Sequence, residues 1–161
     1  MSCNATDRAK GSSARTYHQD YDNGVRSEKE CHPYIETYLE QPIPPTENRY
    51  SKFDWVNKTT LAELKTRSSI YRERYPTTYV NKSKWDFALK SERDAFFFVR
   101  FSDGLFVYKQ DAADDGVFEI EHVRNANRDR YTRGNPCICI PVDRLQFVDH
   151  VPPPSNEVRL D

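Results

Sequence analysis

The stretch FDWVNKTTLAELK, residues 53–65, decides the fold that we expect for this chain of 161 residues. Polar and apolar residues alternate on both sides of a central Asn-Lys-Thr tripeptide, which suits a turn. The pattern predicts a β-hairpin whose strands cover 49–56 and 61–67. Because side chains alternate between the two faces of a strand, Glu63 and Lys65 are expected to share one face.

Two helices are predicted, one on either side of this hairpin in the chain. Apolar residues at helical spacing predict the first from about Val25 to Gln41. Proline has no amide hydrogen, so this helix either starts near Glu30 or is kinked at Pro33. Asn81 is a good N-cap for a second helix over 82–90.

Most of the predicted strands follow the second helix. We expect strands at 94–101 and 105–110 around a Ser-Asp-Gly turn, and two more at 118–123 and 137–142. The run Phe96–Val99 is apolar on both faces, which predicts a central strand that is covered on both sides. The order of elements therefore predicts an α/β fold in which helices flank one mixed central β-sheet.

The length of the chain suits one domain with a single core. We expect this domain to span 24–149, between flexible tails at 1–23 and 150–161 that are polar or proline-rich. The sequence has no signal peptide and no apolar stretch near the roughly 18 residues of a membrane span. A soluble intracellular protein of the cytoplasm or nucleus, without a membrane partner, is therefore expected. The four cysteines lack CxxC spacing and are expected to be buried and free, and a zinc site that includes His122 or His32 is the alternative.

A net charge of −1 excludes recognition of nucleic acid through overall basic charge, so such contacts would have to come from local clusters. Two arginine clusters stand out, one at Arg72 and Arg74 and the other at Arg128, Arg130 and Arg133. Arginines among tyrosines can bind phosphates and stack on bases. An ordinary solvated loop is the alternative for both clusters.

The hairpin also carries the residues that predict chemistry. Asp54 lies close to the turn, so its carboxylate can converge with that of Glu63 on the partner strand. Such carboxylates suit Mg²⁺ or Mn²⁺, and the backbone carbonyl of Leu64 would add a third oxygen. The metal would activate a water, which Lys65 would orient while offsetting negative charge at a phosphate. A solvated sheet face with a cross-strand ion pair is the alternative.

Asp54, followed after eight residues by Glu63-Leu64-Lys65, resembles the D-x(n)-E-x-K signature of PD-(D/E)XK nucleases, the restriction-endonuclease-like superfamily. The order of elements over the whole expected domain is also similar to the core of that superfamily. Phe53 stands where many members have proline, at a position that varies widely. The resemblance implies a restriction-endonuclease-like core and Mg²⁺-dependent hydrolysis of DNA.

The resemblance also implies residues around this centre. The segment Gly24–Lys29 is similar to the G-x-x-x-E-[RK] segment of archaeal-type Holliday junction resolvases, which implies Glu28 as a further metal ligand, with Glu36 as its rival. An acid favoured by the helix dipole is the alternative reading of Glu28. Members commonly place a Lys or Gln of the second helix at the active site. In this chain the resemblance implies Lys84 for that position, in preference to Lys82.

The leading interpretation is a DNA endonuclease or exonuclease of recombination, repair, restriction or host-DNA degradation. Its partner would be DNA, and a homodimer stays open because cutting two strands with one-site subunits usually needs two of them. The alternatives are an RNA endonuclease of the same fold and a non-catalytic nucleic-acid-binding or assembly module. Retention of all three central residues argues against the non-catalytic module.

Overall fold

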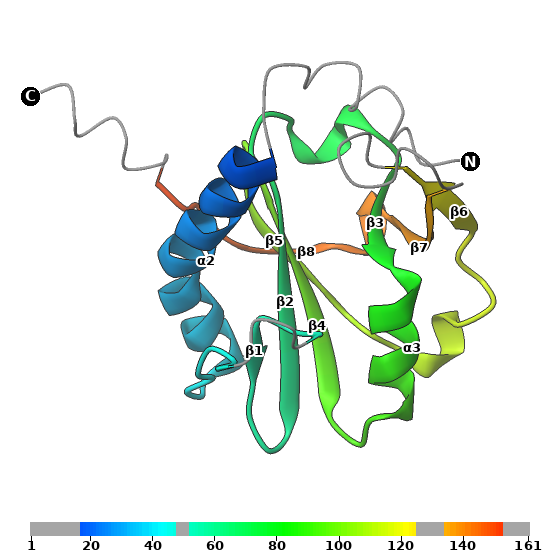
Figure 1. The fold of residues 1–161 in the computed structure, drawn as a ribbon, viewed down its shortest axis with the longest axis horizontal. Helices are drawn as coiled ribbons and strands as arrows, with labels where there is room; N and C mark the ends of the chain where they lie inside the picture. The colour runs from blue at the N-terminus through cyan, green and yellow to red at the C-terminus, as the bar shows by residue number, and fades with distance from the viewer. Residues whose placement is uncertain (1–16, 48–51, 125–133, 153–161) are drawn as a thin grey trace, which may run out of the picture.

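The computed structural model describes residues 17–47, 52–124 and 134–152 (Figure 1). Its helices are α2 (Tyr17–Leu39) and α3 (Lys82–Lys90). The central sheet has the order β1-β2-β4-β5-β8, with β1 (Trp55–Val56), β2 (Thr60–Arg67), β4 (Asp94–Phe101), β5 (Gly104–Lys109) and β8 (Gln146–Asp149). Strands β2 and β4 run parallel, and the other neighbours run antiparallel. The prediction of an α/β fold with a mixed central sheet is therefore confirmed.

A second, antiparallel sheet lies outside the prediction. It has the order β3-β7-β6, with β3 (Thr77–Asn81), β7 (Asn135–Pro141) and β6 (Ile120–Val123). The expectation of one sheet is wrong because the strands predicted at 118–123 and 137–142 pair with each other and with β3. Short 3-10 helices also occur, namely η1 (Arg72–Arg74), η2 (Ala112–Asp114) and η3 (Val142–Arg144).

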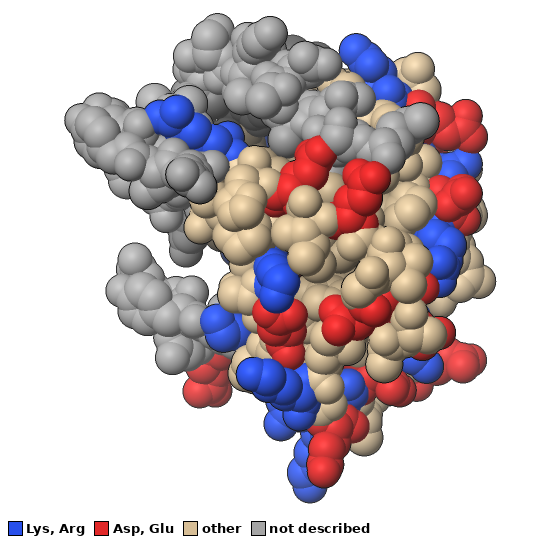
Figure 2. Space-filling model, turned by 90° about the vertical axis from the view of Figure 1, so that its right-hand side faces the viewer, with Lys and Arg blue, Asp and Glu red and all other residues tan. Residues whose placement is uncertain are grey.

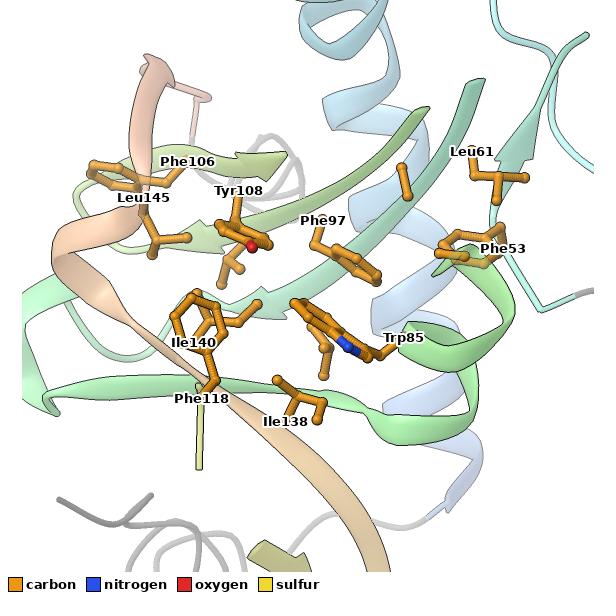
Figure 3. Packing of buried hydrophobic residues seen from close by; sticks show 14 of the residues in the cluster. Phe53, Leu61, Trp85, Phe97, Phe106, Tyr108, Phe118, Ile138, Ile140 and Leu145 are labelled. Atoms are coloured by element: carbon orange, nitrogen blue, oxygen red, sulfur yellow. The ribbon is translucent and has the colours of Figure 1, made fainter. Parts of the chain in front are cut away.

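The central sheet is covered on both faces, by α2 on one side and by α3 with the second sheet on the other (Figure 1). Each face of the central sheet has its own hydrophobic core, and strand β4 contributes side chains to both. Phe98 packs with Ile35 of α2, and Phe97 packs with Trp85 of α3. The Trp85 ring stacks on Phe97 and Tyr108, with ring centroids 6.2 and 6.0 Å apart (Figure 3). Burial of each such ring contributes about 1.5–3 kcal/mol. The prediction of a central, doubly covered strand is confirmed.

Helix α3 has the bounds that its capping residue predicts. The Asn81 side chain accepts a hydrogen bond from the backbone N–H of Ser83 at 2.9 Å, which satisfies one of the free amides of the first turn. Trp85 and Ala88 form its buried face. Among the described residues no helix is long and apolar enough to cross a membrane.

Helix α2 starts earlier than predicted. It begins at Tyr17 and runs through Pro33, so the predicted helix start is too late. Toward the C-terminus, the carbonyl of Pro152 accepts a hydrogen bond from the Arg100 guanidinium at 2.6 Å. The chain is therefore anchored beyond residue 149.

The cysteines follow the prediction only in part. Cys31 and Cys137 are buried free thiols, as expected. Cys139 is disulfide-bonded, so the expectation of a free thiol is wrong at this position.

Candidate active site at the edge of β2

The short length of β1 leaves one edge of β2 open. The two strands pair only through Trp55 with Ala62 and Val56 with Leu61, whereas β4 pairs with β2 along its whole length. From Glu63 onward, β2 therefore has no neighbouring strand on the β1 side within the described residues. Backbone groups at such an edge need other partners.

Asp54 supplies one of these partners. Its Oδ2 atom accepts a hydrogen bond from the backbone N–H of Leu64 at 2.9 Å. The N–H and C=O of one strand residue point to the same side, so the Leu64 carbonyl faces this edge as well. Phe53 packs in the core beside α3, whereas Trp55 packs in the core beside α2. The chain therefore passes from one face of the central sheet to the other at Asp54, next to the open edge of β2.

Glu63 projects from β2 toward α3 and is 8% exposed. Its Oε2 atom accepts a hydrogen bond from the Lys84 ammonium, and the two side chains form an ion pair. Its Oε1 atom is buried and has no hydrogen-bond partner in the described structure. Burial raises the pKa of Glu63, the Asp54 carboxylate raises it further, and Lys84 opposes the shift. A buried carboxylate oxygen without a partner is costly, and in a native protein it suggests an absent ligand.

Glu28 brings a third carboxylate from α2. Burial and the neighbouring Asp54 carboxylate raise its pKa from 4.5 to about 7. The adjacent Ser27 holds this turn of the helix in place, because its buried hydroxyl accepts hydrogen bonds from Thr66 at 2.7 Å and Arg100 at 3.0 Å. The α2 acid therefore approaches the open edge from the face opposite to Glu63.

The rivals of Glu28 and Lys84 have other partners. Glu36 accepts a hydrogen bond from the backbone N–H of Ile43 at 2.8 Å. Lys82 forms an ion pair of 2.7 Å with an acid of its own helix. By contrast, Glu28 interacts electrostatically with Asp54, and Lys84 interacts with Glu63.

Lys65 lies on the same face of β2 as Glu63 and is partly buried. Its Nζ atom is 5.9 Å from the centre of the Tyr79 ring on β3. Burial lowers the pKa of Lys65, the positive charge of Arg67 lowers it further, and Glu63 opposes the shift. A partly desolvated ammonium of this kind is well suited to act at a negatively charged reaction centre.

Together these residues form the candidate site: three acids (Glu28, Asp54 and Glu63) and two lysines (Lys65 and Lys84). Within the described ranges, no group of three or more His, Cys, Asp or Glu side chains has the arrangement of a metal site. The donor chemistry nevertheless fits Mg²⁺, because the unpartnered Glu63 Oε1 is a hard oxygen ligand beside further carboxylates. Burial and, after it, repulsion by Asp54 raise the pKa values of Glu28 and Glu63, and a divalent cation would relieve the repulsion.

Two of the arginines that were predicted to contact nucleic acid, Arg72 and Arg74, contact residues outside this site. Arg72 donates a hydrogen bond to the Val142 carbonyl at 3.0 Å, and its guanidinium lies 5.4 Å from the centre of the Phe106 ring. Arg74 is exposed and lies 4.6 Å from the centre of the Tyr75 ring. The remaining arginines lie outside the described residues: Arg128, Arg130 and Arg133.

Sequence reasoning missed Arg67 and Tyr79. The guanidinium of Arg67 lies 4.9 Å from the centre of the Tyr79 ring, next to Lys65. The alternation that places Glu63 and Lys65 on one face continues to Arg67, so that signal was present in the sequence. Tyr79 belongs to the unpredicted strand β3, and its position beside β2 had no local signal.

The face that carries α3 and the second sheet has acidic and basic side chains interspersed (Figure 2). The described residues form no broad surface of one sign in this view. Any contact of this face with a polyanion would therefore depend on a few placed cations.

Comparisons of the chain with protein-family models, with curated proteins and with solved structures found no match.

Proposed function

We propose that this protein is a Mg²⁺-dependent deoxyribonuclease with a PD-(D/E)XK-type active site. The observation that carries the proposal is the Glu63 Oε1 atom, which is buried and has no hydrogen-bond partner among the described residues. Besides burial, the Asp54 carboxylate raises the pKa of both Glu63 and Glu28, so Asp54 interacts electrostatically with both acids at the open edge of β2. Lys65 lies on the same strand face, two residues after Glu63. Acids with an adjacent lysine suit the hydrolysis of a phosphodiester, whose transition state gains negative charge.

The architecture supports the same proposal. A helix precedes the β1–β2 hairpin and covers one face of the mixed sheet, and a second helix precedes the central strand β4 on the other face. This order is similar to the core of restriction-endonuclease-like enzymes, and we propose that the chain has such a core. The second sheet would then be an addition on the α3 side.

Each residue of the site has a role in this proposal. Asp54 and Glu63, with the Leu64 carbonyl and Glu28, would hold the metal ion. Bound Mg²⁺ or Mn²⁺ would lower the pKa of a coordinated water and offset negative charge on the phosphate. The Lys65 ammonium orients the attacking water by hydrogen bonding and offers a proton at Nζ to stabilise the developing charge.

Lys84 has a positioning role. By donating to Oε2, its ammonium fixes the orientation of the Glu63 carboxylate and directs Oε1 away from the ion pair. Its positive charge also favours the ionised form of Glu63, which is the form that binds a cation. We therefore expect Lys84 to affect metal affinity more than the chemical step.

A cleavage assay tests the proposal. The full chain is incubated with Mg²⁺ or Mn²⁺ and with linear, nicked, branched or single-stranded DNA, and separately with RNA. Glu63→Gln should abolish metal-dependent cleavage of DNA, whereas Lys82→Met, a control whose ammonium is paired with Asp86 of the same helix, should leave it unchanged. Cleavage of RNA alone would favour the RNA endonuclease. Binding of DNA without cleavage under any of these conditions would favour the non-catalytic module.

A further inference from the structure

Two neighbouring cations of β2 form no ion pair with any of the described residues. Lys65 and Arg67 lie two residues apart on one strand face, and within the described structure neither forms an ion pair. The Nε atom of Arg67 is buried and has no hydrogen-bond partner among the residues that the structure describes, and the Nη1 atom donates to the Thr66 carbonyl at 3.2 Å. By contrast, Lys84 is paired with Glu63. Partly buried cations without a counter-ion are costly, so this pair is suited to receive an anion.

The Arg67 guanidinium is held in place before any ligand arrives. It lies 4.9 Å from the centre of the Tyr79 ring, and the Lys65 ammonium lies 5.9 Å from the same centre. Tyr79 is fixed by β3, which pairs with β7 along its whole length. Cation–π contact with a ring on a rigid strand limits the rotamers of a long side chain, which lowers the entropic cost of binding.

The geometry points to a phosphate-binding subsite at Arg67, supported by Tyr79, that contacts a DNA phosphate flanking the one that is cleaved. The planar guanidinium can donate two parallel hydrogen bonds to phosphate oxygens. Arg67 lies four residues beyond Glu63, roughly 13 Å along the strand, so a single phosphate cannot contact both sites closely. Lys65 lies between them and completes a line from the carboxylates to Arg67.

This subsite takes its ligand class from the proposed nuclease function. Contact with a phosphate does not itself require cleavage, so the two can be tested separately. A purely structural role, in which Arg67 only fastens β2 to β3 through the Tyr79 ring, predicts a loss of stability without a change in affinity for DNA.

Binding is measured by fluorescence anisotropy with a DNA duplex in EDTA, where no metal-dependent cleavage can occur. Arg67→Met should weaken binding about tenfold and lower the slope of log K against log salt by about 0.9, the value for one lost phosphate contact. Arg67→Lys should keep the slope and lose part of the affinity, because the charge remains without the planar fork. Arg93→Met, at an exposed position outside the site, is the control with the same change of charge and should alter binding less than twofold.

A series of duplexes, each with one neutral methylphosphonate linkage, locates the contact. At one position, replacing the phosphate by the neutral linkage should lower the affinity of the wild-type protein about tenfold. The same replacement should leave the affinity of Arg67→Met unchanged, as in a double-mutant cycle. Equal sensitivity of both proteins at every linkage, with matching thermal melting curves, would overturn the inference. If Arg67→Met unfolds, Arg67→Lys is tested in the same series of duplexes. An affinity and a sensitivity to each linkage that both equal those of the wild type would then also overturn the inference.

The same proteins in Mg²⁺ separate this inference from the proposed function. Cleavage by the wild type together with unaltered binding by Arg67→Met would leave the nuclease standing and refute the subsite. Dependence of binding on Arg67 without cleavage by the wild type would refute the nuclease and support the subsite. Absence of any DNA binding by the wild type would refute both.

Discussion

Replacing Glu28 by Gln should stabilise the protein in the absence of metal, by an amount that grows as the pH rises from the ordinary pKa of the carboxyl group, 4.5, to its raised pKa in the folded state, about 7. In the folded state, burial and the Asp54 carboxylate raise the pKa of Glu28 from 4.5 to about 7. A raised folded pKa means that ionisation opposes folding, so the wild type loses stability as the pH rises from about 4.5 to 7. The glutamine does not titrate and avoids this loss.

The magnitude follows from the size of the shift. A shift of this size corresponds to at most about 3.4 kcal/mol at 1.36 kcal/mol per pKa unit. Since Glu28 is only partly buried, solvent screening reduces this to ~1–2 kcal/mol. For a chain of this length, that gain raises the melting temperature by about 2–8 °C.

Calorimetry in EDTA at pH 8 and pH 4 tests Glu28→Gln. The stabilisation should be present at pH 8 and absent at pH 4, where the carboxyl group is protonated in both the folded and the unfolded state. Added Mg²⁺ should raise the melting temperature of the wild type more than that of the variant, because the ion binds the folded site. Glu36→Gln, on the same helix but bonded to the Ile43 amide, is the control and should give no such gain.

Equal melting temperatures at pH 8, or a gain of the same size at pH 4, would refute this reasoning about Glu28. The first result would mean that the carboxylate is not destabilised by its surroundings. The second would mean that the effect of glutamine is one of packing and has nothing to do with charge.

Three further substitutions have expected outcomes. Lys65→Met should reduce the cleavage rate at least 100-fold in a single-turnover assay while changing the metal-free affinity for DNA by less than tenfold, and full activity would contradict its role. Lys84→Met should lower the free energy of unfolding in EDTA by about 1–3 kcal/mol in urea titrations, because Glu63 loses its partner; an unchanged midpoint would contradict this. Arg72→Ala should lower that free energy by ~1 kcal/mol, because the hydrogen bond to Val142 is lost, and a tenfold loss of DNA affinity without destabilisation would show instead that Arg72 binds DNA.

Local signals in the sequence predict much of the central sheet. The Asn81 cap predicts the start of α3, and the apolar run of β4 identifies the central strand because a strand covered on both faces has apolar residues at successive positions. The alternation in β2 places Glu63 and Lys65 on one face. Each of these features depends on neighbours in the chain, which is why it can be read without the structure.

The missed features depend on contacts between distant segments. Strand β3 has five residues, and it forms because β7, far along the chain, pairs with it. Strand β8 is mostly exposed and lacks the alternation of a half-buried strand. The support of Arg67 by Tyr79 depends on the position of β3 beside β2, so no spacing in the sequence could predict it.

The short length of β1 also bears on solubility. An unpaired strand edge can add a strand from another copy of the chain, which is a route to aggregation, and inward or flanking charges are a common protection against it. We expect the charges of Glu63, Lys65 and Arg67, which this edge strand carries on the face toward α3, to provide that protection. We therefore expect that a variant with all three residues neutralised would aggregate, which makes single substitutions the sounder way to test each residue.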